Sequence, residues 1–138
     1  GLNMLANMRL CSNVLAQQVV QTSLGGTQSV DELLLPGGRI YEQREFIYKA
    51  MNEIPGISAV KPKAAFYIFP KIDTAMYNIH DDEQFVLDFL KQEKVMLVHG
   101  RGFNWKDPDH FRIVYMPRVD ELAQIQEKMT RFLSKYRQ

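Results

Sequence analysis

Cysteine is almost absent from this sequence, which has only Cys11 among its 138 residues. One cysteine cannot form an internal disulfide, and such scarcity is typical of a reducing compartment, so we expect a cytoplasmic protein. Cys11 lies in the segment MRLCSN, where the spacing is helix-like, and we interpret it as a small buried apolar residue rather than a nucleophile. Histidine is also rare: His80, His99 and His110 lack metal-ligand spacing, which predicts no metal site.

A charge excess and long apolar runs are missing as well. The net charge of +1 gives no electrostatic reason to expect nucleic acid or an anionic membrane as a partner. No apolar run approaches the length of a membrane-spanning helix, and no basic-then-apolar signal opens the chain. The hydrophobic share of 46% and the charged share of 24% are ordinary for a globular protein of one domain.

The beginning of the chain is unusual, because Gly1 stands where methionine is usual and the first residues already have helical spacing. We therefore expect the 138 residues to be a piece cut from a longer chain. Apolar residues from Leu2 to Leu24 predict a helix, in one piece or two, which the pair Gly25-Gly26 ends.

Helical spacing of apolar residues recurs three more times, with the helices beginning after Gly38, at Asp81 and at about Asp120. The expected inner faces carry Ile40, Ile47, Met51 and Ile54 in the first, Phe85, Phe89 and Leu90 in the second, and Leu122, Ile125, Met129, Phe132 and Tyr136 in the third. Ser29 and Glu32 have the spacing of a capping box ahead of a short turn, Val30–Leu35.

Three short apolar runs rich in β-formers lie between and beyond these helices: Phe66–Phe69, Val95–Val98 and Phe111–Met116. Pro70 and Gly100 end the first two runs. The order of elements is helix, helix, strand, helix, strand, strand, helix. It predicts an α/β unit (an α+β two-layer arrangement) in which helices cover one face of a small three-stranded sheet.

The third run carries a permanent charge, Arg112, among apolar residues. Side chains alternate across a strand, so Arg112, Val114 and Met116 should share one face and the remaining residues the other. A buried guanidinium without a partner is costly, so a partner is expected. One alternative is a salt bridge to Asp107, Asp109 or another acid. The other is a ligand carboxylate, which the planar fork of arginine binds through both oxygens.

The loop VHGRGFNWKDPDH precedes this strand, and its length is typical of functional loops. Its G-x-G is a weak phosphate signal, since no helix follows it. The segment His80-Asp81-Asp82 is better interpreted as a helix N-cap than as a ligand cluster. We do not include Phe66, Tyr67 and Phe103 in the site, because apolar strand and loop positions more often belong to the core. No nucleophile, general base or cofactor site is readable, so no catalytic residue is assigned.

Six segments together carry a resemblance to one family. They are NMLANMRLCSN, PGGRIYEQREFI, KPKAAFYIFPKID, NIHDDEQFVLDFLKQEKVMLVHG, GFNWKDPDHFRIVYMPRVDEL and the closing helix. In the same order and without gaps, they resemble the C-terminal part of class I aminotransferases, the pyridoxal-phosphate enzymes of fold type I. Within that family the chain is most similar to the bacterial alanine (glutamate–pyruvate) aminotransferases.

The resemblance implies that residues 1–138 form the C-terminal small domain, with residues 1–26 as the helical link to a missing large domain. In the family the large domain holds pyridoxal 5'-phosphate through a lysine, and a strand arginine of the small domain binds the α-carboxylate of the substrate. The matching residue is Arg112, in HFRIV. The expected substrates are an amino acid (alanine or glutamate) and a 2-oxo acid (pyruvate or 2-oxoglutarate), and the full-length enzyme is expected to be a homodimer.

The chain departs from the family pattern in several places. The cofactor-lysine motif and the residues that bind the cofactor's phosphate and ring are absent, so this piece should hold no cofactor and have no activity alone. Ala64 stands where many relatives have glycine and His99 where many have proline, while Arg101 occupies a position expected to be small or polar. These three residues are expected to affect substrate preference. Two other hypotheses stay open: a freestanding, non-catalytic domain that binds a carboxylate, and a structural domain in which Arg112 forms an internal salt bridge.

Overall fold

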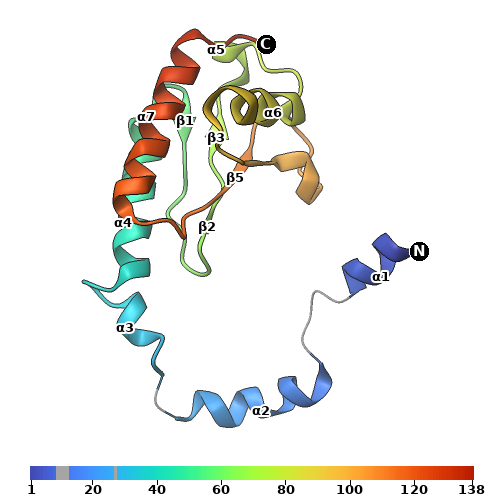
Figure 1. Cartoon of the computed structure of the whole chain (residues 1–138), viewed down its shortest axis with the longest axis vertical. Coiled ribbons are helices and arrows are strands. Elements are labelled where there is room, and N and C mark those ends of the chain that lie inside the picture. The colour runs from blue at the N-terminus through green and yellow to red at the C-terminus, as the bar shows by residue number, and fades with distance from the viewer. Residues whose placement is uncertain (9–12, 27) are drawn as a thin grey trace. The chain divides into compact units, whose positions relative to one another are not determined.

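The computed structural model describes residues 1–8, 13–26 and 28–138, shown in Figure 1. The chain divides into two compact units, Gly1–Glu32 and Leu33–Gln138. The described residues of the first unit form α1 (Leu2–Met8) and α2 (Val14–Leu24), both within the range Leu2–Leu24 predicted to be helical. The Asn13 side chain caps α2 by accepting a hydrogen bond from the backbone N–H of Ala16 at 2.8 Å. Cys11 lies outside the described residues.

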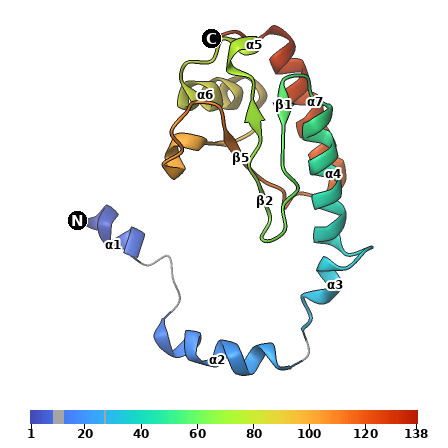
Figure 2. The ribbon, with the colours of Figure 1, turned by 180° about the vertical axis from the view of Figure 1, so that it is seen from behind.

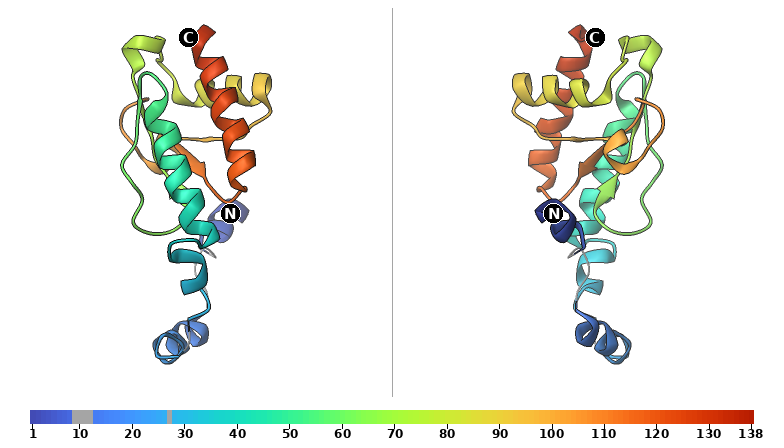
Figure 3. Two further views of the ribbon diagram at one scale, coloured as in Figure 1. Left: turned by 90° about the vertical axis from the view of Figure 1, so that its left-hand side faces the viewer. Right: turned by 90° about the vertical axis from the view of Figure 1, so that its right-hand side faces the viewer.

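The second unit contains the helices that the sequence predicts, each beginning within a residue or two of its expected start, and one further short helix. They are α3 (Asp31–Leu34, which begins in the first unit), α4 (Arg39–Glu53), α5 (Thr74–Tyr77), α6 (Asp82–Glu93) and α7 (Val119–Lys135). The short helix α5 had no counterpart in the sequence prediction. Helices α4 and α7 lie side by side and run in the same direction, and α6 crosses α7 (Figure 3).

The sheet that the sequence predicts is present as three antiparallel strands in the order β2-β5-β4. The strands are β2 (Tyr67–Ile68), β4 (Val98–His99) and β5 (Phe111–Val114), so β5 is the central strand. Strands β2 and β5 run alongside each other (Figure 2). The strand expected over Val95–Val98 begins only at Val98, because Lys94 closes α6 in the left-handed conformation and the next residues are needed to reach the sheet.

A second, two-stranded sheet was not predicted. It pairs β1 (Ile57–Ser58) with β3 (Lys71–Ile72) in antiparallel register. Pro70 interrupts the extended chain between β2 and β3 but does not end it, since the chain resumes pairing at once. The N–H of Ile72 donates to the carbonyl of Asp109 at 2.8 Å, which ties β3 to the residues just before β5.

The core lies between the three-stranded sheet and helices α4, α6 and α7. Phe111, Ile113 and Tyr115 point into it, and the Phe85 ring of α6 lies 5.6 Å from that of Phe111. The residues predicted to form the inner faces of the helices are buried or half-buried, except Leu90. Leu90 is 36% exposed, because it lies 100° round the helix from Phe89. Val86, which is buried, takes the inward position that we assigned to Leu90. Within the described residues, no helix is both long enough and apolar enough to cross a bilayer.

The alternation along β5 makes a testable prediction about stability. Phe111 is fully buried, so Phe111→Ala should lower the free energy of unfolding by about 3–5 kcal/mol in urea denaturation. Val114, three residues along the same strand, is 39% exposed. Val114→Ala is the matched control and should cost less than about 1 kcal/mol. Equal losses from the two variants would contradict the assigned faces of the strand.

Candidate functional site

Arg112 occupies the central strand of the three-stranded sheet, opposite Val98 of β4. Its neighbours along the strand, Phe111 and Ile113, are buried in the core, whereas Arg112 is half-buried and Val114 exposed on the other face. This is the alternation expected from the sequence. The guanidinium therefore lies on the face of the sheet opposite to the core, which helices α4, α6 and α7 do not cover.

Two aromatic rings contact the guanidinium of Arg112. Its Cζ lies 4.6 Å from the ring centroid of Tyr67 and 4.3 Å from that of Phe103. Tyr67 comes from β2, where it pairs with Val114 and so shares the face of Arg112. Phe103 comes from the 3-10 helix η1 (Gly100–Phe103) in the loop after β4. Both distances suit cation–π attraction, which lowers the cost of desolvating the charge.

We left Phe66, Tyr67 and Phe103 out of the site because apolar strand and loop positions more often belong to the core, but none of the three is buried. Their exposed fractions are 38%, 39% and 46%. Pairing of Tyr67 with Val114 decides the face on which it lies, and this register is not readable from the sequence of either strand alone. Phe103 is brought to Arg112 by a loop conformation. Only the aromatic character of the two residues offered a signal in the sequence.

Within the described part of the chain, Arg112 forms no ion pair, and its buried Nε–H has no hydrogen-bond partner. The salt bridge to Asp107 or Asp109 that the sequence left open is thus not present. Asp109 instead accepts from the Trp105 Nε1–H at 2.8 Å, lies 2.7 Å from the His110 ring nitrogen Nδ1 and pairs with the Lys71 ammonium at 3.3 Å.

These partners of Asp109 also decide its charge. Burial raises the pKa of the Asp109 carboxyl, but the contacts with His110, Trp105 and Lys71 outweigh burial and hold the pKa below its ordinary value. A carboxylate that is already satisfied has little to gain from a distant guanidinium.

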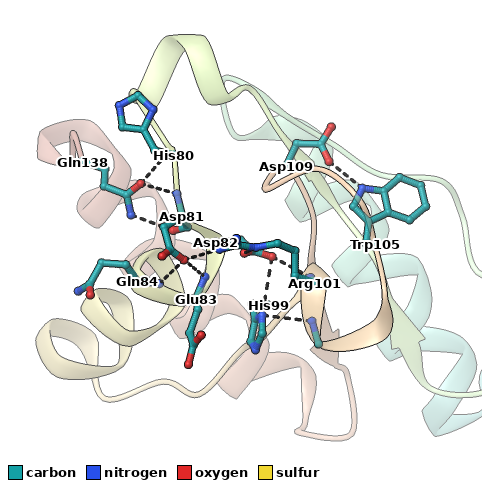
Figure 4. Close-up of polar contacts among 11 residues, drawn as sticks. His80, Asp81, Asp82, Glu83, Gln84, His99, Arg101, Trp105, Asp109 and Gln138 are labelled. Atoms are coloured by element: carbon teal, nitrogen blue, oxygen red, sulfur yellow. Dashed lines mark hydrogen bonds and ion pairs between the residues drawn. The ribbon is translucent and has the colours of Figure 1, made fainter.

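A second cluster holds η1 against the start of α6 (Figure 4). The backbone N–H of Arg101 donates to Oδ2 of Asp82 at 2.8 Å, and its guanidinium bonds both Oδ1 of Asp82 and, at 2.6 Å, Oδ1 of Asp81. Asp82 is only 1% exposed. Burial raises the pKa of a carboxyl, but the backbone and side-chain hydrogen bonds from Arg101 hold the pKa of Asp82 below its ordinary value.

His99 and Arg101, two of the residues that depart from the family pattern, belong to this cluster. His99 accepts a hydrogen bond from the N–H of Gly102 at 3.2 Å, and its Nδ1 lies 3.8 Å from Asp82. Asp81 caps α6, as predicted, by accepting from the N–H groups of Glu83 and Gln84. The buried role of Asp82 was missed, because its partner lies 19 residues away in sequence. The described residues contain no group of three or more potential metal ligands.

The Asp82 cluster makes a prediction about stability and pH. Asp82→Asn should lower the free energy of unfolding by about 1–3 kcal/mol at neutral pH, because it weakens a buried set of hydrogen bonds. The folded-state pKa of Asp82 is depressed, so this contribution is complete above the unfolded pKa near 3.8 and is lost as pH falls from there through the lower folded-state pKa. Urea denaturation at a series of pH values measures it.

Glu83→Gln is the control for the charge of Asp82, because Glu83 is exposed in the same helical turn (Figure 4). It should change the free energy of unfolding by less than about 0.5 kcal/mol. The difference in free energy of unfolding between the wild type and Asp82→Asn should shrink as the pH falls below about 3.8. If this difference stayed constant, the assignment of Asp82 as the titrating group would be wrong.

The chain is similar in sequence to known aminotransferases. No family model matches the chain. It is 59% identical over all 138 residues to the glutamate-pyruvate aminotransferase AlaA of Escherichia coli K12 and 52% identical to an alanine aminotransferase of Mycobacterium tuberculosis. It covers 34% and 32% of those two proteins, and so spans about a third of the length of the curated relatives it matches.

Solved structures agree with the sequence comparison. The crystal structure of an Escherichia coli aminotransferase matches 98% of this chain with a TM-score of 0.83 and 59% identity, over 33% of that chain. An alanine aminotransferase from Pyrococcus furiosus matches 96% of this chain with a TM-score of 0.73 and 39% identity, again over 33% of its own length.

In sequence and in fold, the chain is similar to about a third of an aminotransferase of fold type I. Within that class, the glutamate–pyruvate and alanine aminotransferases match it over its whole length. The resemblance stated from the sequence motifs is thereby confirmed.

The lysines of this chain do not form a site for pyridoxal phosphate. Every lysine of the chain is exposed or half-buried. Lys61 pairs with Glu45 at 2.7 Å and Lys71 with Asp109. A lysine that bonds covalently to a cofactor must be free to react inside the cofactor's site, whereas Lys61 and Lys71 are engaged by carboxylates at the surface.

Proposed function

We propose that this chain acts as the small domain of a pyridoxal-phosphate-dependent aminotransferase, and that Arg112 binds the α-carboxylate of the substrate. One observation carries the proposal: Arg112 lies half-buried on the open face of the central strand, and no carboxylate among the described residues pairs with it. A guanidinium in that position is matched by an incoming acid, which it can bind through two parallel hydrogen bonds.

Binding of the carboxylate contributes orientation as well as affinity. A carboxylate held at both oxygens cannot rotate freely, so the bonds at the neighbouring carbon are fixed relative to the reacting groups. Arg112 belongs to a strand that is hydrogen-bonded on both sides, and such a support restricts its backbone. The full-length protein would hold pyridoxal phosphate through residues outside this chain.

The proposed substrates are alanine or glutamate as amino donor and pyruvate or 2-oxoglutarate as acceptor. The names of the relatives that match the whole chain support this choice. Residues 1–26 would form the helical link to the large domain, and the full-length enzyme would be a cytoplasmic homodimer. The effect of Ala64 on substrate preference stays a prediction. His99 and Arg101 contact Asp82 rather than Arg112, which favours an indirect effect for both.

The alternative of a freestanding carboxylate-binding or structural domain is not favoured. Similarity extends over the whole chain to enzymes of about three times its length. No described salt bridge engages Arg112, so its position does not support a structural role of that kind.

Arg112→Lys in the full-length protein tests the proposal directly. Lysine keeps the charge but loses the planar fork, so kcat/KM for alanine should fall by about two to four orders of magnitude, which corresponds to about 2–5 kcal/mol. Cofactor loading, measured by absorbance, should be unchanged. Arg131→Lys is the control and should leave the kinetics unaffected, because Arg131, on α7, pairs with Glu93, on α6. Unchanged kinetics in Arg112→Lys would remove the assignment.

The isolated 138-residue chain provides a second test. Under the proposal, half of the substrate site is missing, so isothermal titration with alanine, pyruvate or 2-oxoglutarate should show no saturable binding, and added pyridoxal phosphate should produce no lysine-bound absorbance. The full-length protein in the same titrations is the positive control. Tight saturable binding of one of these acids to the isolated chain would favour a freestanding sensor instead.

A further inference from the structure

We infer that Tyr67 and Phe103 are positioning residues for carboxylate recognition, acting through Arg112. The inference rests on the proposed role of Arg112 and adds two residues to it. The two rings come from different elements, β2 and η1, and both contact the same guanidinium. An arginine side chain has several rotatable bonds, and packing against two rings restricts the orientation of its planar head.

The hydrogen-bonding state of the guanidinium indicates which edge is presented. Of its nitrogen atoms, only Nε is buried without a hydrogen-bond partner. A carboxylate that takes two parallel N–H···O bonds from an arginine needs two adjacent donors. With Nε enclosed, the pair that remains is Nη1 and Nη2. The rings thus hold Arg112 so that it binds a carboxylate end-on.

Both rings are supported by contacts within the chain. Tyr67 is held by the antiparallel pairing of β2 with β5, and its ring lies 4.9 Å from that of Phe66. Phe103 ends the 3-10 helix that Asp82 holds through the backbone N–H and guanidinium of Arg101. The orientation of Arg112 is therefore set in advance of binding, and preorganisation of this kind lowers the entropy cost of recognition.

A purely apolar role is the competing explanation for the two rings. In that case they would only cover the stem of Arg112, and any side chain of similar volume would serve. The two explanations differ in one respect. If the rings position Arg112, their effect on carboxylate binding requires an aromatic face and disappears when Arg112 is removed. If they only shield the stem of Arg112 from water, their effect on stability does not depend on the guanidinium.

The test uses the full-length protein with Tyr67→Leu and Phe103→Leu, measuring kcat/KM for alanine and the inhibition constant of propionate, which offers a carboxylate without an amine. Each variant should lower kcat/KM and raise the inhibition constant by about two- to thirtyfold, the range that a cation–π contact represents. Tyr67→Phe keeps the ring, so its kcat/KM and inhibition constant should equal those of the wild type. Phe103→Met keeps the apolar volume without a ring, so it should behave like Phe103→Leu and replaces it if that variant does not fold.

Tyr41→Leu is the matched control, because it removes another cation–π contact, with Arg44 at 5.0 Å on α4. It should leave both constants unchanged. In an Arg112→Leu background, the ring substitutions should cause no further loss, since there is no guanidinium left to position.

The outcomes separate the inference from the proposed function. If Arg112→Lys leaves alanine kinetics unchanged, the proposed function is wrong. If Arg112→Lys is severely impaired while Tyr67→Leu and Phe103→Leu have the same kinetics as Tyr41→Leu, the positioning role is wrong and the function of Arg112 stands. The same conclusion follows if Tyr67→Leu or Phe103→Leu causes a further loss of activity in the Arg112→Leu background. Loss of activity in Tyr67→Phe equal to that in Tyr67→Leu would also overturn the positioning role, because the hydroxyl rather than the ring would be responsible.

Discussion

The guanidinium of Arg112 is held in a partly buried position by aromatic rings rather than by a carboxylate. Removing a permanent charge from water is costly, and an internal salt bridge is the usual compensation. Here the compensation is two ring contacts, which reduce the cost without neutralising the charge. The cation therefore stays available to an anion from outside. The proposed function depends on this arrangement.

Two acids of this part of the fold, Asp109 and Asp82, have partners other than Arg112. Asp109 is bonded to Trp105 and paired with Lys71, and Asp82 is buried against Arg101. Each of these contacts also fixes part of the loop between β4 and β5, and hence the ring of Phe103. The same polar contacts that order the loop thus keep neighbouring carboxylates away from the guanidinium. Stability of the loop and availability of Arg112 have a common physical origin.

The fold could be predicted from the sequence where the signal is local. Helical spacing with glycine, proline and aspartate at the ends located α4, α6 and α7, and period-two alternation assigned the buried and open faces of β5. Prediction failed where pairing between distant segments decides. Strands β1 and β3 are two residues each, too short for any periodicity, and they exist because β3 is held beside the residues preceding β5. The face of Leu90 was wrong because a helix turns by 100° per residue.

The sequence by itself determined that a permanent cation lies on an otherwise apolar strand, which face of that strand carries it, and which family the motifs resemble. These are properties of residue type and spacing along one segment. Only the tertiary structure decided that Arg112 lacks a carboxylate partner and that Tyr67 and Phe103, 36 residues apart, contact its guanidinium. The reason is physical. Strand register and loop conformation bring those side chains together, and both are set by the packing of the whole unit rather than by any local pattern.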